Sequence, residues 1–570
     1  MRYVLLRMTT HMPDTYVFYT ALTLLSFFFL IKASTRLKLS RAKHPSVRGH
    51  SKWARRIAKW IPYFSYAEEA FFSSDKAPLA VVNQRKEGFK QLSESLACHS
   101  PKSTEFYASL EDSVSDVRFT NLYRVPYPYR NYLGQHIKSA SIVTESSGIM
   151  LKDLDGRWGI DLSGSYGVNV FGYDFYKSCL EIGYENAQSL GPVLGPYHPI
   201  IKNNVEELKR ISGLDEVSFH MSGTEAVMQA VRLARYHTGK RYLVRFCGAY
   251  HGWWDGVQPS IGNQRKTNDV YTLRDISERT LSILQTRNDI ACVLVNPLQG
   301  LHPNSDASSD AMLLNSERAA AFDKTAYSEW LQTLHQVCKE RSIVLIFDEV
   351  FTGFRLSHKG AQGFFAVQAD LVTYGKTLGG GLPVGVLCGR HHLMQRFKED
   401  RPANVSFARG TFNSHPYVMT SMNAFLQAVQ AEDIQRSYQV LEQVWNDRVQ
   451  QMNQALNEAG VPVKLANLTS ILTVLYTQPS RYNWMYQYYL RNEGILLSWI
   501  GTGRLIMSHN FTDEEFAEVI KHFISAGLKM KKDGWWWQHS ALTNKWIKRR
   551  MLKDMVKSVS AKRLVKEAKR

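Results

Sequence analysis

The 570-residue chain contains little that would build a disulfide-stabilised or zinc-stabilised fold. Its six cysteines are scattered without a CxxC pair, and several lie in apolar runs, where a buried thiol behaves as a small hydrophobic side chain. This pattern argues against a disulfide framework and against a metal site, and it favours a reducing compartment. The chain also lacks a low-complexity run, so its composition favours a folded globular body with room for more than one structural unit.

Acidic residues are scarce at both ends of the chain, and this scarcity sets the net charge of +19. Residues 1–60 hold twelve Lys/Arg and one acid, and residues 529–570 hold fourteen Lys/Arg and three acids. Each end therefore carries +11, whereas the body between them carries about −3. Because no nucleic-acid recognition module accompanies the basic ends, we expect no nucleic-acid partner.

A long apolar run lies near the N-terminus. TYVFYTALTLLSFFFLI (Thr15–Ile31) is uncharged over 17 residues, and five Lys/Arg follow it by residue 43. This length is at the short end for a bilayer-spanning helix, and no small-residue cleavage site precedes the basic block. We interpret residues 1–43 as a membrane anchor, single-pass or monotopic, whose basic flank places the rest of the chain in the cytoplasm. A buried core helix is the alternative.

Composition and the pattern of apolar residues divide the rest of the sequence into five segments. Residues 44–145 are a basic and aromatic extension, and residues 146–215 open with a strand, an Asp-Gly turn and a second strand. In residues 216–405 short apolar runs (EVSFHM, RYLVRF, ACVLVN, SIVLIFDEV) alternate with helical patterns, which predicts a mainly parallel α/β sheet. Residues 406–528 are expected to form a smaller α+β unit. In the tail, residues 529–570, GWWWQHS and spread cations favour a helix on anionic lipid over a nucleic-acid tail or a solubilising face.

The segment YGKTLGGGLPVG (374–385) combines a lysine with a glycine run. A phosphate loop requires G-x-x-x-x-G-K-[ST], and counting back from Gly375 puts Asp370 where the first glycine must be. The glycines that follow do not fit the dinucleotide pattern G-x-G-x-x-G either. Lys376 is therefore a candidate for covalent catalysis, which requires a neutral, accessible amine.

Three other segments place polar residues at the ends of predicted strands. SIVLIFDEVFTGFR ends a strand with two carboxylates, Asp348 and Glu349, at the edge where α/β sheets bind ligands. The acid either faces a cationic cofactor nitrogen, the role we expect for Asp348, or is an ordinary strand-end acid that caps a helix or pairs with Arg355. SFHMSGTEAV places Ser222, Gly223 and Thr224 at a helix N-terminus, as a cap or as a site for one phosphate.

The third of these segments is FCGAYHGWWDG, which carries the pair Tyr250-His251 between glycines. Tyr250 either belongs to the core or lays its ring over a flat cofactor.

Together these motifs resemble the class III (subgroup II) aminotransferases of fold type I, which depend on pyridoxal 5'-phosphate. SGTEAVMQAVRLAR, AYHG, DEVFTGFR, DLVTYGKTLGGGLPVG and GTFNSHP occur in the family's order, and the resemblance covers roughly residues 145–528. Within the family, DLSGSYGVNVFGY makes the chain look most similar to the glutamate-1-semialdehyde aminomutase branch. The resemblance implies an α/β fold with a large, mainly parallel-sheet domain and a smaller α+β domain, here preceded by the N-terminal membrane helix.

The resemblance also implies roles at the cofactor ring. Lys376 would hold the cofactor covalently and move the substrate proton, and Asp348 would pair with the ring nitrogen. Val350 and Tyr250 would pack on the two ring faces, with His251 adjacent.

Further positions of the family motifs imply contacts outside the ring. Gly223 and Thr224 of the Ser222–Thr224 loop would hold the phosphate, and Gln299 would contact the phenolic oxygen. Thr411 in GTFNSHP would reach the phosphate of the neighbouring subunit, which implies a homodimer with shared sites. Tyr166 would lie near the substrate.

One position departs from the family pattern. The family usually has Glu-Pro where this chain has Asn296-Pro297, and that glutamate helps to select the substrate in several members. We therefore place Asn296 at the substrate and do not expect the usual ω-amino-acid substrates. Residues 302–325 also form a longer segment than the family's loop, and they either shape the pocket or are a solvated insertion.

These features predict an aminotransferase that moves an amino group from a small-molecule donor to an aldehyde or ketone, which is hydrophobic if the anchor keeps the enzyme at the bilayer. An intramolecular aminomutase of the glutamate-1-semialdehyde type is the alternative reaction. A non-catalytic membrane-tethered scaffold is the alternative of another class, and the intact Lys376, Asp348, Thr224 and Thr411 argue against it. No residue identifies the donor or the acceptor.

Overall fold

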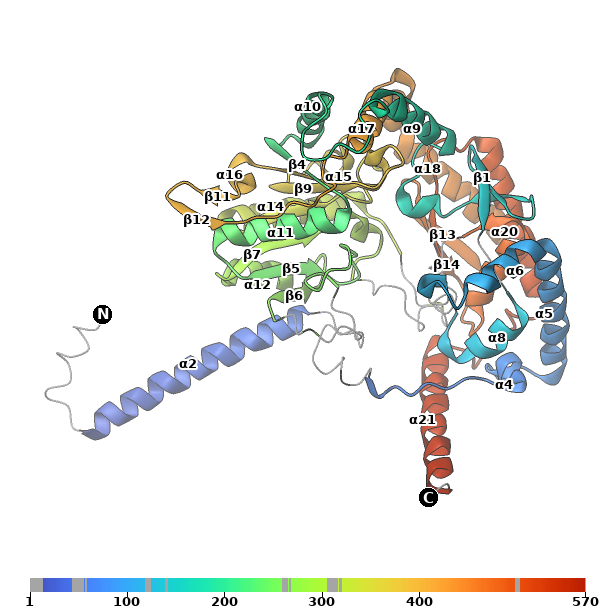
Figure 1. The fold of residues 1–570 in the computed structure, drawn as a ribbon. Coiled ribbons are helices and arrows are strands. Elements are labelled where there is room, and N and C mark those ends of the chain that lie inside the picture. The colour runs from blue at the N-terminus through green and yellow to red at the C-terminus, as the bar shows by residue number, and fades with distance from the viewer. Residues whose placement is uncertain are drawn as a thin grey trace.

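The computed structural model describes residues 14–43, 56, 59–117, 125–138, 142–258, 265, 268–304, 316, 320–497 and 503–568. Most of the predicted 302–325 insertion, and residues 1–13 and 44–55 of the predicted N-terminal segments, lie outside this range. In Figure 1 the body consists of a domain around a central sheet and a second, helix-rich domain beside it. Two helices, α2 (Asp14–Ala42) and α21 (Asn544–Ala568), project from this body.

A seven-stranded sheet organises the first domain, in the order β4-β10-β9-β8-β7-β5-β6. Its strands are β4 (Glu216–His220), β5 (Tyr242–Phe246), β6 (Val270–Leu273), β7 (Ile290–Val295), β8 (Val344–Asp348), β9 (Leu371–Gly375) and β10 (Gly385–Gly389). The four strands predicted from apolar runs, β4, β5, β7 and β8, are confirmed. All pairs are parallel except those of β10, which runs antiparallel to both neighbours. The connection from β9 to β10 is too short for a parallel crossover, so the chain reverses.

The sheet is buried on both faces, which explains its continuous apolar strands. In β7, Val293 and Val295 pack into one hydrophobic cluster, whereas Cys292 and Leu294 pack into another on the opposite face. This alternation follows from the two-residue period of a strand. The surrounding helices are α11 (Gly223–Thr238), α12 (Glu278–Thr286), α14 (Lys324–Glu340), α15 (Gly360–Phe365) and α16 (His391–Met394).

Three helices pack together beside the sheet: α9 (Tyr173–Ala187), α10 (Ile201–Ser212) and α17 (Pro416–Ala428). Helix α10 also contacts β4, and α9 contacts the strand 143–147 of the second domain. Helix α17 contributes Met422 and Phe425 to the core of the sheet domain, although it falls in the segment 406–528 that was expected to form the smaller unit. A hairpin of β11 (Phe397–Lys398) and β12 (Arg401–Val405) precedes it.

The second domain contains two small sheets and long helices. One sheet is β13 (Val463–Leu468), β14 (Ile471–Tyr476) and β16 (Arg504–Ile506), all antiparallel. The other is β1 (Val143–Ser147), β2 (Met150–Asp153), β3 (Trp158–Asp161) and β15 (Ile495–Leu496), and the predicted strand-turn-strand is its β2–β3 hairpin. The helices are α18 (Glu432–Glu458), α19 (Tyr486–Asn492) and α20 (Asp513–Lys532). Helix α20 starts at a capping box on Thr512 and continues past residue 528, the boundary expected from the sequence.

The N-terminal extension is part of the second domain's core. Its helices are α4 (Glu68–Ser73), α5 (Leu79–His99), α6 (Pro101–Leu110) and α8 (Arg130–His136). Phe71, Phe89 and Trp535 lie in one buried cluster, and Trp536 belongs to the same cluster. The expectation that the tail's tryptophans lie on lipid is therefore wrong for Trp535 and Trp536, because these large apolar rings fill the core instead.

Helix α2 contains the apolar run seen in the sequence. Residues Phe18–Ala42 are apolar enough and long enough to cross a membrane. The side chains from Phe18 to Ile31 are exposed, so the alternative of a buried core helix is wrong. Only the end of α2 joins the body: Ala42 is buried, its carbonyl accepts a hydrogen bond from Arg274 N (3.0 Å), and Lys43 forms an antiparallel bridge with Leu273 of the edge strand β6.

Candidate functional site

Lys376 lies where β9 ends and the short 3-10 helix η4 (Lys376–Gly379) begins. Its backbone has φ +47°, a left-handed conformation that is costly for a residue with a side chain and is typical of functional positions. Burial lowers the pKa of its amine; Asp348 opposes this shift and Arg355 adds to it. A lysine that attacks a carbonyl must be neutral, so the environment of Lys376 suits a covalent catalyst.

Two residues that sequence reasoning did not select define the space around Lys376. The Phe351 ring lies 5.8 Å from the Lys376 Nζ. A Cβ on Gly167 would stand 2.5 Å from Phe351 Cε2, so glycine is required where this loop passes the ring. The hydroxyls of Tyr176 and Thr377 are 2.5 Å apart, which ties η4 to α9. These contacts join distant parts of the chain, so no local pattern predicts them. The available signal in the sequence was that these residues lie in or beside the recognised motifs.

Asp348 and His251 form a buried pair at the end of β8. His251 Nδ1 lies 2.7 Å from Asp348 Oδ2. Burial lowers the pKa of His251, and the bond to Asp348 opposes that shift. The other carboxylate oxygen accepts hydrogen bonds from Val350 N (3.2 Å) and Thr373 Oγ1 (3.3 Å). The imidazole N–H, a backbone N–H and a hydroxyl all stabilise the charged carboxylate, as a partner for a cationic ring nitrogen requires.

The predicted alternative partner of Asp348, Arg355, is engaged elsewhere. Its guanidinium donates to Met507 O (2.6 Å), Asn169 O (2.8 Å) and Ser470 Oγ (3.0 Å). Arg355 therefore holds together segments of the two domains.

Glu349, the acid next to Asp348, has a structural role. Its carboxylate accepts from Ala361 N (2.5 Å) and Gln362 N (3.0 Å), at the start of α15. Burial raises its pKa to about 8. Because neighbouring residues leave a strand end on opposite sides, one carboxylate enters the site and the other supports α15.

The loop before α11 is shaped by close backbone approaches. Ser222 Oγ accepts from Glu225 N (3.3 Å), so its side chain caps α11. A Cβ on Gly223 would come within 2.6 Å of Val350 Cγ1, and one on Gly252 would overlap Thr224 Oγ1. The motifs SGTEA, AYHG and DEV thus converge, and the N-terminus of α11 offers the N–H groups and dipole that bind a phosphate.

Asn296 and Gln299 lie in the loop after β7, in or beside the 3-10 helix η3 (Pro297–Leu301). Asn296 Nδ2 donates to Tyr250 O (3.1 Å), and its Oδ1 accepts from Leu298 N (3.1 Å). Gln299 Nε2 donates to Cys247 O (2.5 Å). Asn296 thereby holds the backbone of Tyr250, whose own side chain is 57% exposed and so does not belong to the core.

Tyr166 and Thr411 complete the predicted set. Tyr166 is 47% exposed and has φ +57°, next to Ser165 with φ +45°, in the 3-10 helix η2 (Gly164–Gly167). Thr411 is exposed in the turn that precedes α17. One chain alone therefore leaves Thr411 available to a second copy.

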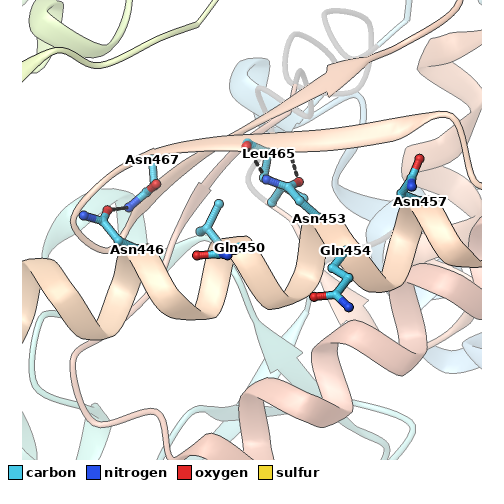
Figure 2. A pocket seen from close by; sticks show the side chains of 8 residues that line it. Asn446, Gln450, Asn453, Gln454, Asn457, Leu465 and Asn467 are labelled. Carbon is cyan, nitrogen blue, oxygen red and sulfur yellow. Dashed lines mark hydrogen bonds between the residues drawn. The ribbon is translucent and has the colours of Figure 1, made fainter.

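An open cavity of about 640 Å³ lies away from these residues, between α18 and β13. Figure 2 shows its lining of amide side chains, among them Asn446, Asn453 and Asn467. Asn453 binds both backbone groups of Leu465 (Nδ2 to O, 2.9 Å; N to Oδ1, 2.7 Å) and so covers the outer edge of β13. The cavity shares no residue with the Lys376 site, and its amide and apolar lining offers no group that could act as an acid, a base or a nucleophile.

Comparisons with known proteins find a family model and related chains. The aminotransferase class-III family model matches residues 134–526. A glutamate-1-semialdehyde 2,1-aminomutase of Nitratidesulfovibrio vulgaris (strain DP4) is 32% identical over 339 residues, which cover 59% of this chain and 77% of that protein. The protein of that name from Methanocaldococcus jannaschii is 30% identical over 379 residues, 64% and 80% of the two chains.

Solved structures share the fold. A glutamate-1-semialdehyde aminomutase from Pseudomonas aeruginosa PAO1 has a TM-score of 0.62 at 17% identity, covering 79% of this chain and 99% of that chain. A transaminase with PLP bound has a TM-score of 0.60 at 24% identity, covering 76% and 99%.

The residues of this site fit pyridoxal 5'-phosphate: an amine of lowered pKa, a buried carboxylate and a glycine-lined helix N-terminus. Because the family model spans more than two thirds of the sequence, we conclude that the chain belongs to the class-III aminotransferases and is a pyridoxal-phosphate-dependent enzyme.

Proposed function

We propose that the enzyme moves an amino group from a small-molecule amino donor to an aldehyde or ketone acceptor. The observation that carries the proposal is the environment of Lys376. Burial lowers the pKa of its amine, and it follows β9, the neighbour of β8 in the sheet. Strand β8 ends in Asp348, the partner of His251. An amine suited to carbonyl addition and a carboxylate suited to a cationic ring are the two groups that amino transfer requires.

Each residue of the site has a role in this proposal. The bound cofactor supplies an electron sink for the carbon that loses its proton. Lys376 would hold the cofactor covalently, and its Nζ would accept and return that proton. Asp348 holds a negative charge at the ring nitrogen, and His251 fixes the orientation of the carboxylate.

The remaining residues bind and orient. Gly223 and Thr224 would hold the phosphate, and Gln299 would contact the phenolic oxygen. Tyr250 and Val350 would flank the ring, and Tyr166 would contact the substrate.

An intramolecular aminomutase is the second candidate, favoured by the names of the relatives that are 30–32% identical to this chain. The two reactions differ in the need for a separate amino donor. In this chain both ends of the Asn296 amide bind protein backbone, so we propose that Asn296 acts on the substrate indirectly, through the position of Tyr250.

We further propose a homodimer with shared sites, in which Thr411 reaches the partner's phosphate. The exposed Phe407 (73%) and Phe412 (50%) on the flanks of Thr411 support a covered surface there. We also propose that α2 anchors the enzyme in a membrane with its body in the cytoplasm, and that the acceptor is hydrophobic.

Half-reaction spectra would test the reaction. The purified enzyme, loaded with pyridoxal phosphate, would be mixed with a panel of amino donors, and then with small soluble and long-chain carbonyl acceptors. Loss of the visible band with a donor, and its return with an acceptor, are the expected results. Turnover of a single substrate without any donor would instead support the aminomutase. A band that no donor changes would contradict both reactions.

A further inference from the structure

Helix α21 has one face turned to the body and one turned outward. On the inner side, Ile547 is fully buried, and Met551 packs against the core of the second domain. Asp554 lies on the same side, one helical turn after Arg550, with which it forms an ion pair (3.2 Å). The spacing of these residues defines a single contact face on the helix.

Asp554 fixes the rotation of α21. It accepts a hydrogen bond from Tyr66 Oη (2.8 Å) and pairs with the buried Arg481 (3.2 Å), while Tyr66 also receives a bond from Arg481 Nη2 (2.6 Å). Three parts of the chain meet in these contacts: the N-terminal extension, the second domain and the C-terminal helix. The outward face of α21 is therefore set by geometry and not by a free rotation of the helix.

The outward face is basic. Lys545, Lys548, Arg549, Lys553 and Lys557 are all exposed. Two apolar side chains lie among them, Leu552 (57% exposed) and Val556 (54%). Intervals of three and four residues place these side chains along one stripe, so the helix presents cations on both sides of exposed apolar groups.

A second exposed apolar group comes shortly before Tyr66, the residue that binds this helix. Trp60 is 79% exposed, and Ile61 (41%) and Tyr63 (49%) follow it, just before the Tyr66 that binds Asp554. Figure 1 shows this segment passing α21 at the lower side of the body, the side from which α2 also extends. Aromatic rings at the edge of a basic face are typical of protein surfaces that enter the lipid headgroup layer.

We propose that the outward face of α21, together with residues 60–63, is a docking surface for an anionic lipid bilayer. The proposal extends the membrane association proposed above for α2, but it rests on different residues. Lysine and arginine pair with anionic headgroups, while Leu552, Val556 and Trp60 enter the boundary with the acyl chains. A nucleic acid would use the cations and leave these apolar groups in water, which makes lipid the better match.

A membrane contact through α21, in addition to α2, would restrict how the body can turn relative to the membrane. Helix α2 alone fixes one point of the body, about which the rest can rotate. A surface on α21 gives another point of contact at the same side, so it restrains that rotation and fixes the direction in which the Lys376 site faces.

Fluorescence from one labelled position would test the surface in the full-length holoenzyme. Cys98 is the exposed cysteine among the six, so Cys98→Ser gives a background for labelling. An environment-sensitive dye would be attached at Leu552→Cys, and at Gln451→Cys on the exposed side of α18 as a control. Vesicles of phosphatidylcholine with phosphatidylglycerol would be compared with phosphatidylcholine alone, and flotation would report binding through α2 separately.

We expect a blue shift at position 552 with the anionic vesicles only, and none at position 451. Higher ionic strength should reverse the shift because it screens the cations. Lys548→Gln, Arg549→Gln and Lys553→Gln together should weaken this contact about 100-fold, at about fivefold per charge, whereas Lys202→Gln, Lys209→Gln and Arg401→Gln should not.

Several results would overturn the docking surface. One is vesicle binding without a shift at position 552, and another is an equal shift with neutral lipid. A larger shift with duplex DNA than with anionic vesicles would identify a nucleic-acid surface instead. The amino half-reaction, recorded on the same samples, reports independently whether the proposed chemistry holds. Failed flotation with phosphatidylcholine alone, beside an intact shift at position 552 with the anionic vesicles, would overturn only the α2 anchor.

Discussion

His251 donates from Nδ1 to Asp348 Oδ2 across 2.7 Å, and both side chains are buried. Burial lowers the pKa of His251, which favours the neutral imidazole, and the carboxylate of Asp348 accepts its hydrogen bond. The pair therefore delivers a fixed negative charge to the end of β8.

This pairing predicts coupled effects on cofactor affinity. Asp348→Asn and His251→Gln should each weaken pyridoxal phosphate binding. Their combined effect should fall short of the sum by about 1.5–3 kcal/mol, the range for a hydrogen bond to a charged group. Absorbance titration of the four proteins would measure the coupling. His392→Gln, at an exposed histidine, is the control, and simple additivity would show that the pair does not act as a unit.

Replacement of Lys376 should remove the covalent link to the cofactor. Lys376→Ala should lower the amino-transfer rate by about 10²–10⁴-fold or more, because both the nucleophile and the proton carrier are lost. After borohydride reduction, mass spectrometry should find the cofactor on residue 376 of the unmodified enzyme and nowhere in the variant. Lys359→Ala removes an exposed lysine and should leave both results unchanged; a cofactor attached to another lysine would contradict the site.

Glu349 should make stability depend on pH. Its pKa is raised from 4.5 to about 8 in the folded protein, so folding favours the protonated form. Its contribution is fully present below pH 4.5 and is lost as pH rises toward 8, by at most about 1.4 kcal/mol per pH unit. Glu349→Gln keeps an acceptor but cannot titrate. Chemical unfolding between pH 5 and 8 should therefore show that the free energy of unfolding declines less steeply with pH in the variant. Parallel curves for the two proteins would show that Glu349 does not cause the pH dependence.

Gly223 should tolerate no side chain. A Cβ there would lie 2.6 Å from Val350 Cγ1, so Gly223→Ala should cost about 1–3 kcal/mol of stability and displace Val350, which we propose flanks the cofactor ring. Gly134 in α8 has open space around it, and Gly134→Ala should be neutral or slightly stabilising. Thermal unfolding and cofactor titration would compare the two; equal effects would mean that the close approach at Gly223 does not matter.

Asn296 should prove more important for structure than for direct substrate contact. Asn296→Asp keeps the acceptor for Leu298 N but loses the donor to Tyr250 O, and it places a negative charge against that carbonyl. We expect a loss of about 1–3 kcal/mol in stability, with a similar fall in kcat/KM for every acceptor. A change confined to one class of acceptor would instead restore Asn296 as a substrate contact.

The sequence predicted the parts of the site that depend on local pattern. The apolar strand before Asp348 is visible as a short motif, and the structure confirms it. The strand 371–375 that precedes Lys376 was not among the predicted strands. The direction of β10 was not predicted, because it depends on the length of the turn and on two partners distant in sequence.

Contacts between distant segments were missed for the same physical reason. Tyr176 is paired with a residue 201 positions away, and Asn296 with one 46 positions away. The prediction that the tryptophans of GWWWQHS face lipid was wrong for Trp535 and Trp536. A cluster of aromatic rings and cations has the same sequence pattern whether the rings face lipid or a protein core. The partner that decided the outcome for Trp535, Phe71 in the N-terminal extension, precedes it by hundreds of residues.

The bridge between Lys43 and Leu273 sets an order on biosynthesis. Helix α2 leaves the ribosome first, but its docking strand β6 is completed more than two hundred residues later. At about 5–20 residues per second this interval lasts roughly 10–50 s. During that time the end of α2 lacks its docking strand. The apolar side chains from Phe18 to Ile31 are exposed throughout, because they find no cover in the described part of the finished fold either.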